Sequence, residues 1–177
     1  MKKRLTLIQM DVHVNDVEYN YNRVQELLTQ SLSESPDIIV LPETWNTGFY
    51  PSDDLITIAD RNGERTKSLL TAFAKEHKVN IVGGSVAIAK DNLVFNTSYA
   101  YNREGTLVGE YSKMHGFSPA KEDKYFASGT HTTHFKLDGI PCSTVICYDI
   151  RFPELVRMAA LPDTELLFVP AQWPTMR

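Results

Sequence analysis

The chain has 177 residues, and 42% of them are hydrophobic. Its 18 basic and 22 acidic residues give a net charge of −4, and no segment concentrates lysine and arginine. This composition is that of an ordinary globular protein, so we expect residues 1–177 to form one domain, with no nucleic acid and no membrane as a partner.

The amino-terminal segment and the cysteines indicate the compartment. Basic residues at the start precede an apolar stretch that is too short for a signal peptide and is interrupted by Gln9 and Asp11. No apolar run has the length of a membrane span. Two cysteines are too few for a disulfide scaffold, so we expect reduced thiols and a cytoplasmic location.

In the first half of the chain, buried strands alternate with amphipathic helices. Asn15 or Asp16 can cap the first helix, and the second helix carries Leu70, Phe73 and His77 on its inward side. We expect strands over residues 5–12, 37–41 and 80–87, and helices over residues 16–33 and 63–77.

In the second half, two turn signals predict two β-hairpins. One turn ends at Gly105, and the other is Asp138-Gly139, the strongest two-residue hairpin signal in the chain. We expect strands over residues 93–101, 106–111, 135–137, 140–147 and 165–169, and a helix from the end of the fourth of these strands to about residue 160. The sequence thus predicts an α/β fold with helices packed on a mixed, twisted sheet.

Cys147 ends the apolar, β-branched run of the strand expected over residues 140–147. The last helix follows, and Pro153 suits a position in its first turn. A side chain at such a turn projects from the carboxyl end of the sheet, and the backbone N–H groups beside it can face an anion. This position favours a nucleophile. The alternative is that Cys147, like Cys142 within the strand, is a small buried core residue.

Two further ionisable residues follow strands in the same way. Glu43 closes the strand over residues 37–41, and Lys113 follows the strand over residues 106–111. Because carboxyl ends of strands meet at one rim, a single twisted sheet can bring them to Cys147. A carboxylate can deprotonate a thiol, the thiolate is a strong nucleophile, and a fixed ammonium can stabilise an oxyanion.

Three segments that carry these residues resemble a known family. Leu41-Pro-Glu43, Tyr111-Ser-Lys113-Met-His115 and Val145-Ile-Cys147-Tyr-Asp-Ile-Arg151-Phe-Pro-Glu154 look like the signature segments of the nitrilase, or carbon-nitrogen hydrolase, superfamily. The resemblance implies an αββα sandwich, built from a longer chain that is dimeric or larger, and no metal or organic cofactor. It implies that residues 1–177 are a single carbon-nitrogen hydrolase domain that lacks roughly the last third and is incomplete at its C-terminus.

Within that superfamily, Phe117-Ser-Pro-Ala-Lys-Glu122 and Trp173-Pro-Thr-Met-Arg177 resemble the ω-amidase branch, which hydrolyses terminal amides of small oxo-acids such as 2-oxoglutaramate. The resemblance implies that Glu43 is the base, Cys147 the nucleophile, and Lys113 with the Tyr148 N–H the oxyanion site. Glu122 matches a further family glutamate that orients these groups or the substrate; its alternative is a solvated loop charge.

The substrate-binding candidates have alternatives as well. Arg151 suits a substrate carboxylate, or pairs structurally with Asp149 or Glu154. Phe49 and Tyr50, in the loop after Glu43, either line the substrate pocket or are aromatic residues on the surface. We expect structural roles for the five histidines, because His131 and His134 lack ligand spacing.

Three functions stay open from the sequence. The first is an ω-amidase acting on a small-molecule amide. The second is another amidase of the superfamily, acting on an N-carbamoyl amine or a deaminated peptide amide. The third is a catalytically silent fragment that acts only through assembly.

Overall fold

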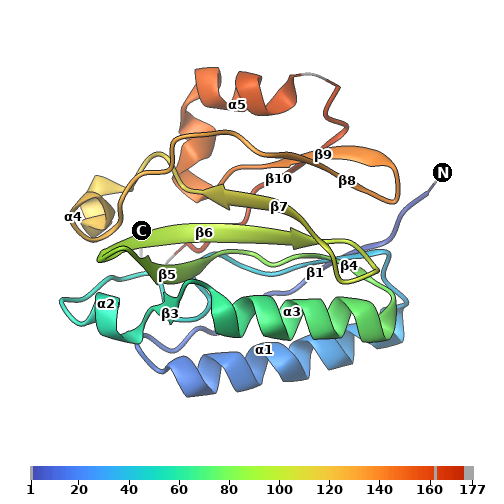
Figure 1. Cartoon of the computed structure of the whole chain (residues 1–177), viewed down its shortest axis with the longest axis horizontal. Helices are drawn as coiled ribbons and strands as arrows, with labels where there is room; N and C mark the ends of the chain where they lie inside the picture. Colours follow the sequence, from blue (N-terminus) through green and yellow to red (C-terminus); the bar gives the residue numbers. More distant parts are fainter. Residues whose placement is uncertain (1, 162, 174–177) are drawn as a thin grey trace.

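Two β-sheets face each other between layers of helix (Figure 1). The computed structural model describes residues 2–161 and 163–173. In Figure 1, α1 (Val17–Ser31) and α3 (Glu64–His77) lie below the larger sheet, the smaller sheet lies above it, and α5 (Pro153–Ala160) is outermost at the top. The order of layers is therefore α, β, β, α, which confirms the expected fold class.

The larger sheet consists of β1 (Leu5–Leu7), β2 (Ile38–Val40), β3 (Asp60–Arg61), β4 (Asn80–Val82), β5 (Val86–Lys90), β6 (Leu93–Tyr101) and β7 (Leu107–Ser112). Its order is β1-β2-β4-β6-β5-β3, with β7 paired to β6. The strands β1, β2 and β4 are parallel, whereas β6 runs antiparallel to β4, β5 and β7. It is a mixed sheet, as expected.

The smaller sheet consists of β8 (His134–Leu137), β9 (Ile140–Thr144) and β10 (Leu166–Phe168), in the order β10-β9-β8. The turn between β8 and β9 has positive φ at Asp138 and Gly139, which confirms the predicted hairpin. The strands β9 and β10 are parallel and are joined through α5, so these three elements form a βαβ unit.

Short helical segments connect these elements: η1 (Leu32–Glu34), α2 (Leu55–Ile58), η2 (Ser118–Ala120), α4 (Glu122–Tyr125) and η3 (Cys147–Arg151). Asp16 caps α1, because its Oδ1 accepts a hydrogen bond of 3.1 Å from the Tyr19 N–H. No helix within residues 2–161 and 163–173 is long and apolar enough to cross a bilayer.

Side-chain alternation along the strands places two cores on opposite faces of the larger sheet. Ile39 of β2 packs with residues of α1 and α3 in the core below the sheet. Its neighbours Ile38 and Val40 pack between the sheets against Phe135 and Phe168. Strands that are buried on both faces read as continuous apolar runs, and β2 is one of them.

Three expectations about elements are wrong. The first strand ends at Leu7 and not at residue 12, because its partner β2 is three residues long. The run over residues 80–87 is two strands, which Gly83 and Gly84 separate. His77, which was expected on the inward side of its helix, is exposed, although its ring contacts that of Phe73.

Candidate active site

Glu43, Lys113 and Cys147 converge, although they come from two sheets. Glu43 follows β2 and Lys113 follows β7 in the larger sheet, whereas Cys147 opens η3 after β9 of the smaller sheet. The expectation that one sheet supplies all three is therefore wrong, because the facing ends of two sheets form the site. All three side chains are buried, with exposed fractions of 0%, 5% and 6%.

The backbone around Glu43 is held by the segment between β4 and β5. The Leu41 N–H donates to the Val82 carbonyl at 3.0 Å, and the Ser85 N–H donates to the Pro42 carbonyl at 3.0 Å. The Ser85 hydroxyl accepts from the Thr44 N–H at 3.0 Å. Glu43 thus lies between two anchored neighbours.

Lys113 lies between two carboxylates, those of Glu43 and Glu122. Its Nζ is 2.8 Å from Oε1 of Glu43, and 3.1 and 2.7 Å from Oε1 and Oε2 of Glu122. Burial lowers the pKa of Lys113, but the charges of Glu43 and Glu122 outweigh burial and hold the pKa above its ordinary value. The lysine is therefore an ammonium ion fixed in place.

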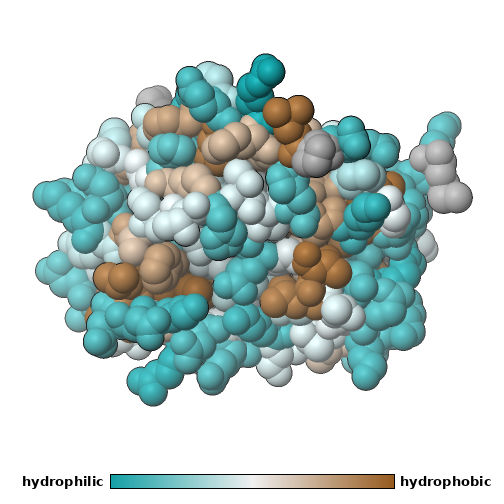
Figure 2. Space-filling view, turned by 45° about the horizontal axis from the view of Figure 1, so that its top comes forward, coloured by the Kyte–Doolittle hydropathy of each residue, from teal (hydrophilic) through white to brown (hydrophobic). Residues whose placement is uncertain are grey.

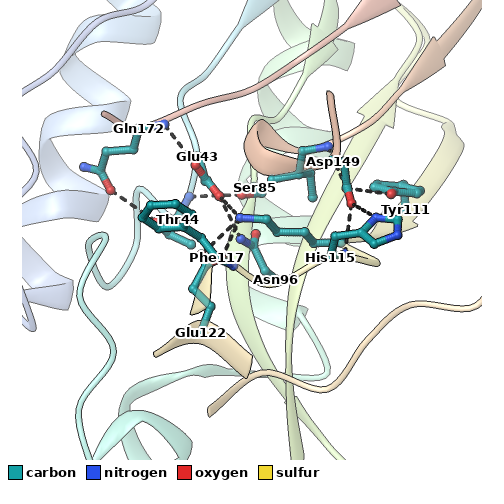
Figure 3. Close-up of polar contacts among 12 residues, drawn as sticks. Glu43, Thr44, Ser85, Asn96, Tyr111, His115, Phe117, Glu122, Asp149 and Gln172 are labelled. Carbon is teal, nitrogen blue, oxygen red and sulfur yellow. Dashed lines mark hydrogen bonds and ion pairs between the residues drawn. The ribbon is translucent and has the colours of Figure 1, made fainter. Parts of the chain in front are cut away.

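Both oxygens of Glu43 are oriented by donors. Besides Lys113, the Asn96 amide donates to Oε1 at 3.1 Å, and the Gln172 N–H donates to Oε2 at 2.9 Å. Figure 3 shows Gln172 and Asn96 on different sides of this carboxylate. The carboxylate is thereby held in one orientation.

Cys147 lies in a strained turn and carries a proton at neutral pH. Its φ of 46° is in the left-handed region, which residues other than glycine rarely adopt. Burial raises the pKa of the thiol to about 12, and the charge and hydrogen bond of Glu43 act in the same direction, whereas Lys113 lowers it. The thiol therefore needs a base before it can attack, and Glu43 is beside it.

Glu122 is enclosed at the start of α4, with 1% of its surface exposed. Its Oε2 accepts from the Phe117 N–H at 2.6 Å in addition to Lys113. Burial raises its pKa, although the charge of Lys113 acts against that. A solvated loop charge, the alternative left open by the sequence, is therefore wrong.

Of the aromatic candidates, Phe49 is buried and Tyr50 is 52% exposed. The ring of Phe49 is 6.4 Å from that of Phe117, which is 5.1 Å from the ring of Tyr148. Phe49 therefore belongs to an aromatic cluster beside the Phe117 backbone N–H that binds Glu122. The exposed ring of Tyr50 packs edge-on against the ring of Phe49. Phe117 was not predicted as part of this cluster.

Arg151 ends η3 and is exposed to solvent. Within the described residues, no ion pair joins it to Asp149 or Glu154, so the predicted structural pairs do not form. Its guanidinium is not part of the buried charge cluster, which leaves substrate binding as a proposal.

Sequence reasoning missed Asn96, Gln172 and the role of Asp149 as a buried acceptor. Asn96 lies within β6 and looks like any polar strand residue, and Gln172 contributes only a backbone N–H. Of the predicted ω-amidase segment at the end of the chain, residues 174–177 lie outside the described residues. The described part of the chain contains no group of three His, Cys, Asp or Glu side chains suited to a metal ion.

Comparisons with known proteins agree on one family. The carbon-nitrogen hydrolase family model matches residues 4–177. The 2-oxoglutaramate amidase of Bacillus subtilis is 38% identical over 177 residues, which are 100% of this chain and 68% of that protein. A hydrolase in the agr operon of Staphylococcus aureus is 34% identical over 176 residues, which are 98% of this chain and 67% of that protein.

Solved structures share the fold. An amidase from Nesterenkonia sp. superposes with a TM-score of 0.84 at 22% identity, covering 96% of this chain and 64% of that one. A CN-hydrolase superfamily protein from Xanthomonas campestris superposes with a TM-score of 0.85 at 28% identity, covering 99% and 66%. The chain spans about two thirds of the length of these relatives. It belongs to the carbon-nitrogen hydrolase family.

Proposed function

We propose that the protein hydrolyses the terminal amide of a small dicarboxylic acid monoamide, of the 2-oxoglutaramate type, to a carboxylate and ammonia. The observation that carries this proposal is the contact of the Lys113 ammonium with Glu43 at 2.8 Å and with Glu122 at 2.7 Å, beside the Cys147 thiol. The similarity to proteins named 2-oxoglutaramate amidase and omega-amidase supports this choice of substrate.

In the first half of the reaction, Glu43 takes the thiol proton as the sulfur of Cys147 attacks the amide carbon. The negative charge then develops on the amide oxygen, where the Lys113 ammonium and the Tyr148 N–H stabilise it. Glu43 returns the proton to the amide nitrogen, the carbon–nitrogen bond breaks, and ammonia leaves. The product of this half is a thioester at Cys147.

In the second half, Glu43 takes a proton from water, whose oxygen attacks the thioester carbon. The same ammonium and N–H group stabilise the second oxyanion. The carbon–sulfur bond breaks, the thiolate regains a proton from Glu43, and the carboxylic acid is released. Glu122 positions the ammonium throughout.

Ammonia release from 2-oxoglutaramate tests this function. Cys147→Ser is expected to lower kcat by about 10⁴-fold or more, as removal of a catalytic nucleophile does. Cys142→Ser is the matched control, because Cys142 is buried between the sheets and outside the site. Normal ammonia release by Cys147→Ser would contradict the mechanism.

A panel of amides separates the alternatives. Faster hydrolysis of an N-carbamoyl amine or a deaminated peptide amide would replace the proposed substrate with the second candidate. No ammonia from any amide would favour the catalytically silent fragment. We propose that residues 1–177 form a single carbon-nitrogen hydrolase domain, and comparing its rate of ammonia release with that of a longer relative tests whether these residues suffice for activity.

We also propose a homodimer or larger homo-oligomer in the cytoplasm. Both cysteines are free thiols, which suits a reducing compartment. The face in Figure 2, on which α5 comes forward, carries hydrophobic patches among hydrophilic residues. Met158 of α5 and Leu161 after it are 52% and 56% exposed. Light scattering after size exclusion tests the oligomeric state.

A further inference from the structure

Asp149 is a buried carboxylate that the mechanism above does not use. It lies two residues after Cys147, and no part of its side chain is exposed. Oδ2 accepts from the Tyr111 hydroxyl at 2.7 Å and from the Ile146 N–H at 3.1 Å. Oδ1 accepts from the His115 N–H at 2.9 Å and is also 2.9 Å from His115 Nδ1 (Figure 3).

These contacts join the two segments that carry the proposed catalytic groups. Tyr111 and His115 lie two residues before and two residues after Lys113, on the side of the larger sheet. Ile146 directly precedes Cys147, on the side of the smaller sheet. One carboxylate therefore holds the backbone of the lysine segment against the turn that carries the thiol.

Asp149 also forms two hydrogen bonds with Ile146, across the turn that contains Cys147. Its own N–H donates to the Ile146 carbonyl at 3.0 Å, while its Oδ2 accepts from the Ile146 N–H. Cys147, between them, has the positive φ of 46° that a residue with a side chain keeps only where its surroundings impose it. The reciprocal pair of hydrogen bonds supplies that constraint.

We propose that Asp149 is a positioning residue, which fixes the Cys147 thiol relative to the Lys113 ammonium so that the oxyanion forms within reach of both Lys113 and the backbone N–H. This inference rests on the proposed amidase function. A displacement of about 1 Å between reacting groups costs on the order of 100-fold in rate, which sets the size of the expected effect.

Asparagine is the discriminating substitution at this position. It has nearly the shape of aspartate but offers one acceptor oxygen and one NH₂ group. In either orientation the NH₂ group faces a backbone donor, the N–H of Ile146 or that of His115. Asp149→Asn therefore releases one of the two backbone segments and leaves no cavity.

Asp60→Asn is the matched control. Asp60 also accepts from two backbone N–H groups, of Arg65 at 3.1 Å and Thr66 at 2.8 Å, and from a tyrosine hydroxyl, that of Tyr21 at 3.1 Å. It lies in β3, shortly before α3, and none of its partners is a site residue. Both variants are expected to lower Tm by a similar amount.

Steady-state kinetics well below Tm then separate positioning from folding. Asp149→Asn is expected to lower kcat about 100-fold and to change KM by no more than about 2-fold, while Asp60→Asn keeps the kcat of the wild type. A kcat for Asp149→Asn within about 3-fold of the wild type would overturn the proposal, as would an equal loss in Asp60→Asn.

Two further measurements keep the test independent of folding and of the substrate. In the wild type, hydrogen exchange at the Ile146 and His115 amides is expected to be strongly protected, and rapid exchange would overturn the proposal even if Asp149→Asn does not fold. Alkylation of Cys147 by iodoacetamide is expected to be faster in Asp149→Asn than in Asp60→Asn, and equal rates would refute positioning. Absence of ammonia release by the wild type would instead refute the proposed function, and the alkylation result would still stand.

Discussion

At the scale of single residues, the site combines one ammonium and two carboxylates with a neutral thiol. Burying ions is costly unless each is paired and hydrogen-bonded, and Lys113 satisfies both Glu43 and Glu122. The thiol stays protonated because burial and the neighbouring carboxylate raise its pKa. In the proposed mechanism the nucleophile therefore forms only when Glu43 takes the proton, so activity depends on one proton transfer between two adjacent groups.

Glu43→Gln is expected to make the thiol more acidic and, at the same time, to slow ammonia release. The charge and hydrogen bond of Glu43 raise the pKa of Cys147, so their removal moves that pKa below about 12. Ammonia release falls about 10²- to 10⁴-fold, because the general base is gone. Iodoacetamide alkylation against pH, in a Cys142→Ser background, measures the first effect. An alkylation profile that does not move toward lower pH would contradict this account.

Arg151→Gln is expected to raise KM for 2-oxoglutaramate and leave a neutral aliphatic amide unaffected. Arg151 is exposed, and a hydrogen-bonded contact with a charged group contributes about 1.5–3 kcal/mol, which corresponds to roughly a 10- to 100-fold change in KM. Arg157→Gln, on the exposed side of α5, is the control. Equal increases in KM for both amides would assign Arg151 a role other than binding the carboxylate.

Residue types at strand ends could be read from the sequence, and their orienting partners could not. Glu43, Lys113 and Cys147 each follow an apolar run, so their position is a local feature. Asn96 contacts Glu43 across a sequence separation of 53 residues, and the donor from Gln172 is a main-chain group common to nearly every residue. Such partners become visible only when the chain has folded.

At the scale of elements, the hairpins were predictable because their turns are set by local chemistry. Asn102 Oδ1 accepts from the Glu104 and Thr106 N–H groups, which closes one turn, and Asp138-Gly139 adopts positive φ in the other. The break between β4 and β5 was missed because its cause is distant. Gly84 lies against the backbone of Leu41 and Pro42, directly before Glu43.

Gly84→Ala is expected to destabilise the protein more than Gly139→Ala does. Both glycines have positive φ, of 62° and 82°, but a Cβ at position 84 would lie 2.0 Å from the Pro42 carbonyl oxygen, whereas nothing lies within 4 Å of one at position 139. We expect losses of about 2–4 kcal/mol at position 84 and about 1–2 kcal/mol at position 139. Urea denaturation measures both.

The same pair tests how β4 and β5 position the base. Because Glu43 directly follows Pro42, displacement of the Pro42 carbonyl by the new methyl group also displaces Glu43. Folded Gly84→Ala is expected to lose kcat, while Gly139→Ala keeps it. Equal stability and equal kcat in the two variants would contradict the role of Gly84.

At the scale of the whole molecule, the sequence predicted the strands but not their division into two sheets. Apolar runs show that a strand is buried, yet they do not show which strand it faces. Val82 of β4 and Phe168 of β10 belong to one core between the sheets. Nothing in the sequence of either strand distinguishes this core from the one between the larger sheet and the helices α1 and α3. The resemblance to the family, and not the pattern, supplied the αββα order.

An ionic cluster joins the two sheets at the end of β2 opposite to that of Glu43, because Asp37 precedes β2 and Glu43 follows it. Asp138, in the turn of the smaller sheet, accepts from Lys3 Nζ at 2.7 Å and from Arg103 Nε at 2.7 Å. Lys3 precedes β1 and Arg103 lies in the turn between β6 and β7, both in the larger sheet. Asp37, before β2, pairs with the same two cations at 3.5 and 3.7 Å. The cluster therefore ties the smaller sheet to the larger one.

This cluster is expected to make the protein less stable in acid. Hydrogen bonds from Arg103, with a smaller effect of Lys3, hold the pKa of Asp138 below its ordinary value of 3.8, so the folded state binds the proton less readily than the unfolded state. The stabilisation is complete above about pH 5 and is lost progressively as the pH falls below about 4. Asp138→Asn therefore lowers the unfolding free energy at pH 7, and its difference from the wild type shrinks toward pH 2.

Asp11→Asn, at an exposed position, is the control. Urea midpoints at a series of pH values measure the difference, and a gap that stays constant down to low pH would show that Asp138 does not stabilise the sheets as a charged group.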